Sequence, residues 1–216
     1  MSFENSQLEF ESLKNNVELG IKSFLQNESN LLINNKEISK KITNITTQTI
    51  KNLKLWMCES IPEKYKKIVL KNIYEKNWSE IIEAFKQELS FGTSGIRGKL
   101  VVSLDDKKCI DDLKSLNTLG FESNILRGPN SINEITIMKN IFGLIKYMKK
   151  NKFSSIVIGY DSRVCSNSFA RLIANMFLKY NFNVIFFNQI NSLPELSFAV
   201  THFKANMGIE ITASHN

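Results

Sequence analysis

The second half of the chain alternates between short apolar runs and longer amphipathic stretches. Three β-branched or aromatic runs are typical of buried strands: 155–159, 184–187 and 209–211. Between them, apolar residues recur at helical spacing from 169 to 177 and from 196 to 203. The order strand–helix–strand–helix–strand predicts an α/β fold whose parallel strands are joined by right-handed crossovers.

Capping signals place the ends of two of these helices. Ser131 and Glu134 have capping-box spacing ahead of a helix whose apolar face is Ile137, Ile141, Leu144, Ile145 and Met148. Ser192 and Glu195 repeat that spacing, with Pro194 in the first turn. We expect this second helix to bury Leu196, Val200 and Phe203 and to end at Gly208.

The first half of the chain carries helical signals instead. One predicted helix runs from Ser79, a candidate cap, to Leu89. The segment 26–52 is so rich in Asn, Thr and Lys that we expect its inner part to be a loose linker. The change of pattern predicts a helical amino-terminal extension over 1–90 and an α/β domain over 91–216.

Composition narrows the functional class. The 216 residues are 43% hydrophobic and 23% charged, with no apolar run long enough to span a membrane and no signal peptide pattern. Three scattered cysteines, Cys58, Cys109 and Cys165, indicate a reducing compartment, so we expect a cytoplasmic protein. The lysines behind the net charge of +7 are spread along the chain. That spread favours small anionic substrates and predicts no nucleic-acid and no membrane partner.

Polar residues follow two of the predicted strands directly. Asp161, Ser162 and Arg163 come after the first, and the loop 212–216, which carries Ser214 beside His215, comes after the third. Ligands of parallel sheets gather at the carboxyl ends of strands, so both loops point to one site. A serine on such a loop is placed for phosphoryl or acyl chemistry.

A glycine-rich loop at 91–98 offers a third group of polar side chains. Thr93 and Ser94 supply hydroxyls, and Arg97 supplies a planar guanidinium suited to phosphate. The loop has neither a Walker ending nor the spacing of a dinucleotide fingerprint. By itself it fits a structural turn about as well as a phosphate cradle.

Together these segments resemble the α-D-phosphohexomutases, the phosphoglucomutase and phosphomannomutase superfamily. The loop 91–98 is similar to the amino-terminal signature of that family, and 212–216 is similar to its phosphoserine loop. Three intervening segments also fall in the matching places: 128–137, 159–163 and 193–196. The resemblance covers about residues 78–216 and implies the three-layer first domain of the family.

The resemblance also implies a mechanism. Ser214 would be the catalytic serine, phosphorylated in the resting enzyme, with His215 and Arg97 beside its phosphate. Thr93, Ser94, Arg97 and Asn216 would bind substrate or phosphate, and Asp161 and Arg163 would brace the loop as an ion pair. The family uses Mg²⁺, held by the phosphoserine and three aspartates, and glucose 1,6-bisphosphate as an activating phosphoryl donor. The partner would be a phosphosugar substrate.

Several features depart from the family. The metal-binding Asp-x-Asp-x-Asp pattern does not occur, and we expect it, with the sugar-selecting motifs, beyond residue 216 of a longer protein. The connection 101–127 is longer than usual, and its aspartates at 105, 106, 111 and 112 are expected to form a solvated face. A non-catalytic relative and a basic anion-binding module remain alternatives. The sequence leaves the sugar and the oligomeric state open.

Overall fold

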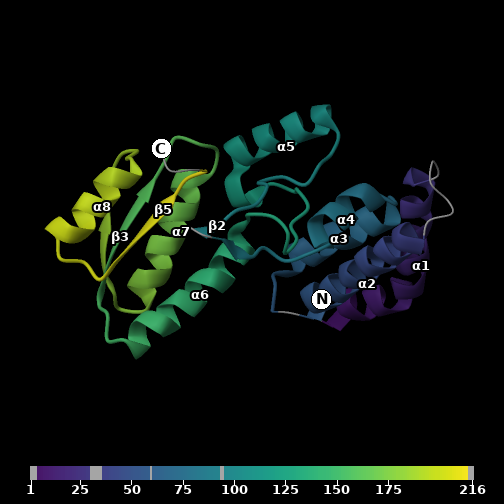
Figure 1. The fold of residues 1–216 in the computed structure, drawn as a ribbon, viewed down its shortest axis with the longest axis horizontal. Coiled ribbons are helices and arrows are strands. Elements are labelled where there is room, and N and C mark those ends of the chain that lie inside the picture. The colour runs from purple at the N-terminus through teal and green to yellow at the C-terminus, as the bar shows by residue number, and fades with distance from the viewer. Residues whose placement is uncertain (1–3, 30–35, 59, 93–94, 214–216) are drawn as a thin grey trace. The chain divides into compact units, whose positions relative to one another are not determined.

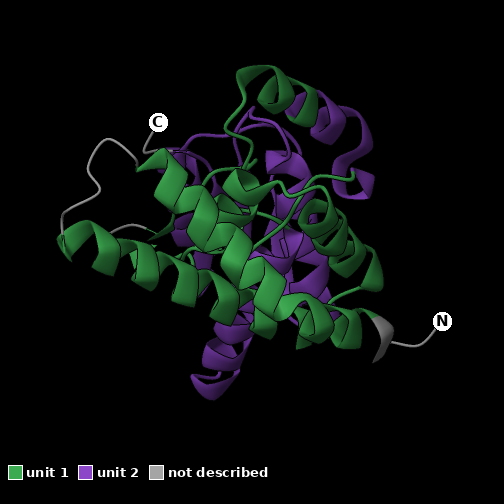
Figure 2. Cartoon of the chain, turned by 90° about the vertical axis from the view of Figure 1, so that its right-hand side faces the viewer, with its two compact units in different colours: residues 1–112, 124–133 green, residues 113–123, 134–216 purple. Residues whose placement is uncertain are grey.

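The computed structural model describes residues 4–29, 36–58, 60–92 and 95–213. The chain forms two compact units, 1–112 with 124–133 and 113–123 with 134–216 (Figure 2). These units differ from the division that we expected near residue 90, since 91–112 and 124–133 group with the amino-terminal helices. The family domain boundary at that point stays a prediction. None of the helices within the described residues combines the length and the apolar character needed to cross a membrane.

The first unit is built on four helices, α1 to α4 (Figure 1): Glu4–Glu28, Lys36–Cys58, Glu63–Tyr74 and Trp78–Phe85. A second set of elements follows them: the two short strands β1 (Phe91–Gly92) and β2 (Gly95–Ile96), and the start of α5 (Asp106–Leu119). The helices bury a shared apolar core that includes Val17, Leu53, Val69, Ile81 and Phe85. This confirms the helical character predicted for the amino-terminal part of the chain.

Three boundaries in this region differ from expectation. The linker expected within 26–52 is wrong for its described later part, because α2 is helical from Lys36 onward. The helix expected from Ser79 to Leu89 is α4, which begins at Trp78 after Asn77 and ends at Phe85. Leu89 lies outside it, where its backbone amide donates to the Pro129 carbonyl at 3.0 Å.

The second unit is a three-stranded parallel sheet in the order β4–β3–β5. The strands are β3 (Ser155–Tyr160), β4 (Asn183–Phe186) and β5 (Met207–Ile211), with α7 (Ser166–Lys179) and α8 (Leu193–His202) connecting them. Both neighbours pair with β3 in parallel: Ile158 lies opposite Phe186 of β4 and Ile209 of β5. The βαβαβ order predicted from the sequence is confirmed.

Alternating side chains of the central strand produce the three layers. Ile156, Ile158 and Tyr160 pack with buried residues of α7 and of α6 (Glu134–Lys150) on one face of the sheet. Val157 packs with Leu196 and Ala199 of α8 on the other face. Because successive side chains of a strand point to opposite faces, β3 is covered on both sides (Figure 1).

The helix ends of this unit follow the sequence signals in part. The capping box of Ser192 and Glu195 is formed as predicted at the start of α8. The helix α6 begins at Glu134, and the capping box expected from Ser131 and Glu134 stays a prediction. Gly208 does not end α8, which stops at His202; it lies in β5, where it packs against Val200 and Leu196. Phe203 is 54% exposed, so the prediction that it is buried is wrong.

Candidate functional site

The loops after β3 and β5 leave the sheet side by side. The backbone amide of Asp161, the first residue after β3, donates to the carbonyl of Ile211, the last residue of β5, at 3.0 Å. This bond continues the strand pairing that joins Tyr160 to Ile211. The two loops singled out from the sequence therefore start from one edge of the sheet, as predicted.

The Asp161 carboxylate connects these two loops to the start of α7. Its Oδ1 accepts hydrogen bonds from the Ser166 hydroxyl at 2.6 Å and from the Arg163 backbone amide at 3.0 Å. Its Oδ2 accepts a bond from the backbone amide of Ala213 at 3.3 Å. One side chain thus fixes its own loop, the first turn of α7 and the residue that precedes Ser214.

These contacts also set the charge of Asp161. Burial would raise the pKa of this carboxyl, because it disfavours the charged form. Hydrogen bonds from Ser166, from the backbone amides of Arg163 and Ala213 and from the Thr212 side chain outweigh burial, so its pKa lies below the ordinary aspartate value. Asp161 is therefore an anion whose lone pairs are used to hold the backbone in place.

Arg163 forms the expected ion pair with Asp161. Its Nε lies 3.4 Å from Asp161 Oδ2, and its side chain is 58% exposed. An ion pair this exposed contributes little to stability, on the order of 0–1 kcal/mol. The three hydrogen bonds that Asp161 accepts from Ser166, Arg163 and Ala213 therefore order this edge more than the ion pair does.

The described ends of the glycine-rich loop pair as two short antiparallel strands in the first unit. Phe91 pairs with Ile96, and Gly92 with Gly95, whose φ of +140° is a conformation that side chains rarely adopt. Arg97 follows β2 directly and is exposed. The guanidinium is thus accessible to a ligand, as a phosphate-binding role requires.

Five of the predicted site residues lie outside the described residues: Thr93, Ser94, Ser214, His215 and Asn216. Their roles remain predictions. The described chain ends at Ala213, directly before the predicted nucleophile. Of the described candidates, Asp161 and Arg163 lie together in the second unit, and Arg97 belongs to the first.

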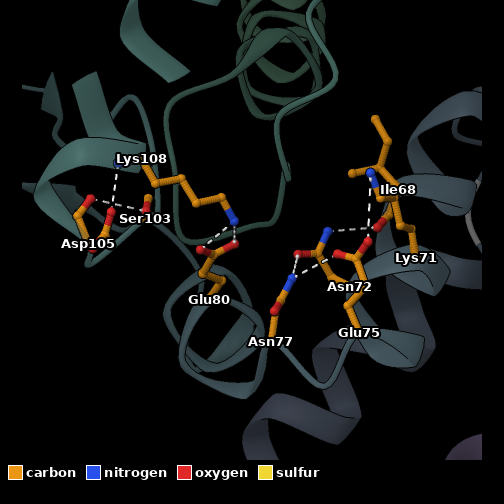
Figure 3. A network of polar contacts seen from close by, with 9 residues as sticks. All are labelled: Ile68, Lys71, Asn72, Glu75, Asn77, Glu80, Ser103, Asp105 and Lys108. Atoms are coloured by element: carbon orange, nitrogen blue, oxygen red, sulfur yellow. Dashed lines mark hydrogen bonds and ion pairs between the residues drawn. The ribbon is translucent and has the colours of Figure 1, made fainter. Parts of the chain in front are cut away.

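The inserted aspartates of 101–127 fold around the start of α5. Asp105 accepts a hydrogen bond from the Lys108 backbone amide at 2.7 Å, and the Lys108 ammonium contacts both carboxylate oxygens of Glu80 at 2.6 Å (Figure 3). Asp105, Asp106 and Asp111 are exposed, as expected of a solvated face. Asp112 is half-buried, and burial raises its pKa. Within the described residues, no group of three or more His, Cys, Asp or Glu side chains is arranged to hold a metal.

Three residues of the carboxyl edge were not identified from the sequence. Gly159 in β3, Asn191 before α8 and Glu210 in β5 lie together, and the Asn191 amide donates to Glu210 Oε2 at 2.9 Å. No short motif contains all three, because each comes from a different segment. The parallel register, which pairs Gly159 with Glu210, was the only available signal.

The sequence that forms this sheet and its polar loops is similar to that of a known protein family. The family described as phosphoglucomutase/phosphomannomutase, alpha/beta/alpha domain I, matches residues 114–216, which include the whole parallel sheet and both of its polar loops. The chain belongs to the phosphohexomutase superfamily. Its α/β/α unit is the first domain of that superfamily, and the fold expected from the resemblance is confirmed.

Two bacterial relatives extend the likeness beyond this domain. A phosphoglucomutase of Staphylococcus saprophyticus is 35% identical over 164 residues, which cover 75% of this chain and 24% of that protein. A phosphoglucomutase of Staphylococcus aureus is 35% identical over 150 residues, or 68% of this chain and 23% of that protein. The chain therefore spans about a quarter of the length of these curated relatives. No solved structure is similar enough to count as a match.

Proposed function

We propose that the protein to which this chain belongs is a phosphosugar mutase. It would move a phosphoryl group between the C1 and C6 hydroxyls, or C1 and C5 hydroxyls, of a sugar phosphate through a phosphoserine and a bisphosphate intermediate. The observation that carries this proposal is the Asp161 carboxylate, which binds the backbone of Ala213 directly before Ser214. Two relatives named phosphoglucomutase support it.

Ser214 is the proposed nucleophile and phosphoryl carrier. A serine hydroxyl is a weak nucleophile at neutral pH, so it needs a neighbouring group that accepts its proton and donors that stabilise the phosphoryl oxygens. We assign the proton transfer to His215, the adjacent residue. We assign charge stabilisation to Arg97, whose exposed guanidinium can form paired bonds with phosphate. Thr93, Ser94 and Asn216 would supply further hydrogen bonds to phosphate.

Asp161 and Arg163 would support the chemistry without taking part in it. The carboxylate fixes the backbone at Ala213, and its depressed pKa keeps it charged at neutral pH. Phosphoryl transfer depends mainly on positioning and charge stabilisation, so a fixed backbone before the nucleophile favours the reaction.

Mg²⁺ is the proposed metal cofactor. Bound to the phosphoserine, it would offset charge on the phosphoryl oxygens. The described residues alone do not fit such a site, because they contain no suitable group of three donors. The proposal therefore requires metal ligands from the phosphate on Ser214 and from aspartates of a longer protein.

Glucose phosphates are the substrates we propose first, with glucose 1,6-bisphosphate as the activating donor. Support comes from the printed names of the two staphylococcal relatives. The enzyme would act as an intramolecular phosphotransferase of carbohydrate metabolism. A cytoplasmic location fits phosphorylated sugars and the three scattered cysteines at 58, 109 and 165.

The test uses the complete protein. Phosphopeptide mass spectrometry of the purified enzyme should place a phosphoryl group on Ser214. Ser214→Ala should lower the conversion of glucose 1-phosphate to glucose 6-phosphate by several orders of magnitude. Ser162→Ala, at an exposed serine of the neighbouring loop, is the matched control and should retain turnover. Full turnover in the Ser214→Ala enzyme would overturn the assignment.

A further inference from the structure

The end of β5 is held from the α8 side of the sheet as well as by Asp161. Glu210 lies two positions after Gly208 and shares its face of the strand. Gly208 packs against Leu196 and Val200 of α8, so the Glu210 side chain also lies on the α8 face. Asp161, by contrast, bonds to Ser166 at the start of α7. The strand that leads to Ser214 thus has contacts on both of its faces.

Asn191 is the centre of the contacts on the α8 side. Its side-chain amide donates to Glu210 Oε2 at 2.9 Å and to the Ser192 carbonyl at 3.1 Å. The side-chain carbonyl of Asn191 accepts a hydrogen bond from the Tyr160 backbone amide at 3.0 Å. The backbone amide of Asn191 donates to the Tyr160 backbone carbonyl at 3.2 Å. A single residue after β4 is therefore bonded to the ends of both β3 and β5.

Gly159 makes this cluster possible. A Cβ atom at this position would overlap with Glu210 Oε2 and with both polar atoms of the Asn191 side chain. Gly159 is also the register partner of Glu210 in the sheet. The missing side chain leaves the space in which the amide and the carboxyl meet.

Among the described residues, no cation balances a negative charge on Glu210. Its Oε1 is buried and has no hydrogen-bond partner within the described residues. The charged groups that act on it from the β3 loop and from α8 are Asp161 and Glu195, both acids. Arg163, the cation of the β3 loop, pairs with Asp161, and His202 lies in the last turn of α8, away from its Ser192 end.

We propose that Asn191 and Glu210 are positioning residues for Ser214: their hydrogen bond holds the end of β5, and Asn191 is itself bonded to Tyr160 at the end of β3. The proposal rests on the role proposed above for Ser214. Neither side chain would touch the substrate; both would act through the backbone of residues 210–213.

Burial and two neighbouring acids favour the uncharged form of Glu210. Burial raises the pKa of its carboxyl, the Asn191 hydrogen bond lowers it, and Asp161 and Glu195 raise it further, with a net increase. Ionisation would place charge on a buried oxygen beside two other acids. The end of β5 should therefore loosen as the pH rises through the raised pKa of Glu210.

Hydrogen–deuterium exchange on the 216-residue chain tests the positioning without any need for activity. Glu210→Ala should lower the protection factors of the amides at 210–213 by roughly tenfold or more, while those of 155–158 stay unchanged. Glu210→Gln keeps an uncharged acceptor for Asn191, so it should retain protection and remove its dependence on pH. Glu122→Gln is the control, an acid-to-amide change at an exposed residue of the same unit. It should leave the protection of 210–213 and the pH dependence of that protection unchanged.

Steady-state kinetics of the complete protein tests whether the hold on β5 affects catalysis by Ser214. A misplaced nucleophile should lower kcat roughly 10- to 100-fold in Asn191→Ala and Glu210→Ala and leave KM nearly unchanged. Glu210→Gln should restore kcat and flatten its fall with rising pH. Wild-type protection and kcat in Glu210→Ala would overturn the proposal. An inactive wild-type protein with the expected exchange pattern would instead contradict the mutase function and leave the β5 anchor standing.

Discussion

Asp161 and Ala213, which are far apart in the sequence, are joined by a hydrogen bond of 3.3 Å between a side-chain oxygen and a backbone amide. The bond connects the first residue after β3 to the last described residue before Ser214. Because Asp161 also accepts bonds from Ser166 and Arg163, the position of Ala213 depends on the start of α7. The hydrogen bonds that fix the residue before the proposed catalytic serine therefore belong to the edge of the parallel sheet.

Replacing Asp161 should loosen this edge. Asp161→Ala removes the charged acceptor of three hydrogen bonds, one partly buried and two exposed, and we expect the free energy of unfolding to fall by about 1–3 kcal/mol. Arg163→Ala removes only an exposed ion pair and should change it by less than about 1 kcal/mol. Urea denaturation of the two variants measures the difference. Equal effects would mean that the ion pair, not the hydrogen bonds, orders the loop.

The Asp161 carboxylate should also make the free energy of unfolding depend on pH in the acidic range. Its pKa in the folded protein is lowered, so its stabilisation is fully present above the ordinary aspartate pKa of about 3.9 and is lost as the pH falls through the lower folded value. Asp161→Asn should therefore reduce the acid sensitivity of unfolding in this range. Melting temperatures between about pH 2 and pH 5 cover the range in which this stabilisation is lost, and parallel curves for the two proteins would contradict the expectation.

Most of the parallel sheet could be predicted from the sequence because its signals are local. Each strand is a short β-branched run between helical patterns, and the Ser192 capping box marks α8 directly. The two polar loops could be paired because parallel strands place their carboxyl ends on one edge. Asn191 and Glu210 could not be identified in this way, since their partnership arises only when three separate segments meet.

The error in α2 has a physical cause. Thr46 and Thr49 suggest a poor helix, but both are buried, and their hydroxyls bond the carbonyls of Ile42 and Ile45 within the helix at 2.9 and 2.8 Å. Packing of this face against the other helices overrides the low helix propensity. The prediction that Gly208 ends a helix was wrong for a similar reason. Its small size allows β5 to pack closely against Leu196 and Val200 of α8.

Gly159→Ala tests how tightly the carboxyl edge is packed. The added methyl group would overlap with Asn191 and Glu210, and we expect a loss of about 1–3 kcal/mol in the free energy of unfolding. Gly143→Ala in α6 is the matched control, because its added Cβ would meet no atom within 4 Å. In that helix interior, alanine should stabilise by up to about 1 kcal/mol. Opposite signs in chemical denaturation are expected, and a stabilising Gly159→Ala would exclude the close packing described here.

Ser192→Ala tests the connection between α8 and this edge. The Ser192 amide donates to Glu195 Oε2 at 2.6 Å, and its hydroxyl completes the capping box. Loss of the cap should cost about 1 kcal/mol. Ser197→Ala, at an exposed position of the same helix, should have little effect. Thermal unfolding of both variants would reveal the difference, and identical melting temperatures would show that the cap is not needed.

The 216-residue chain alone should not interconvert phosphosugars. Phosphoryl transfer relies on charge stabilisation around the phosphate, and the described residues contain no suitable group of metal ligands. The chain also spans only about a quarter of its phosphoglucomutase relatives, which leaves most of their length to supply the rest of an enclosed site. The anchored loop before Ser214 is the proposed contribution of the second unit to such a site, and not the whole of it.

The measurement follows glucose 6-phosphate with a coupled assay after adding glucose 1-phosphate, glucose 1,6-bisphosphate and Mg²⁺ to the purified chain. The chain with Ser214→Ala is the control for background. We expect equal rates, because a nucleophile without charge compensation for the phosphoryl group does not lower the barrier enough for turnover. Turnover above that control would show that residues 1–216 contain all the groups that the reaction needs, and would contradict this prediction.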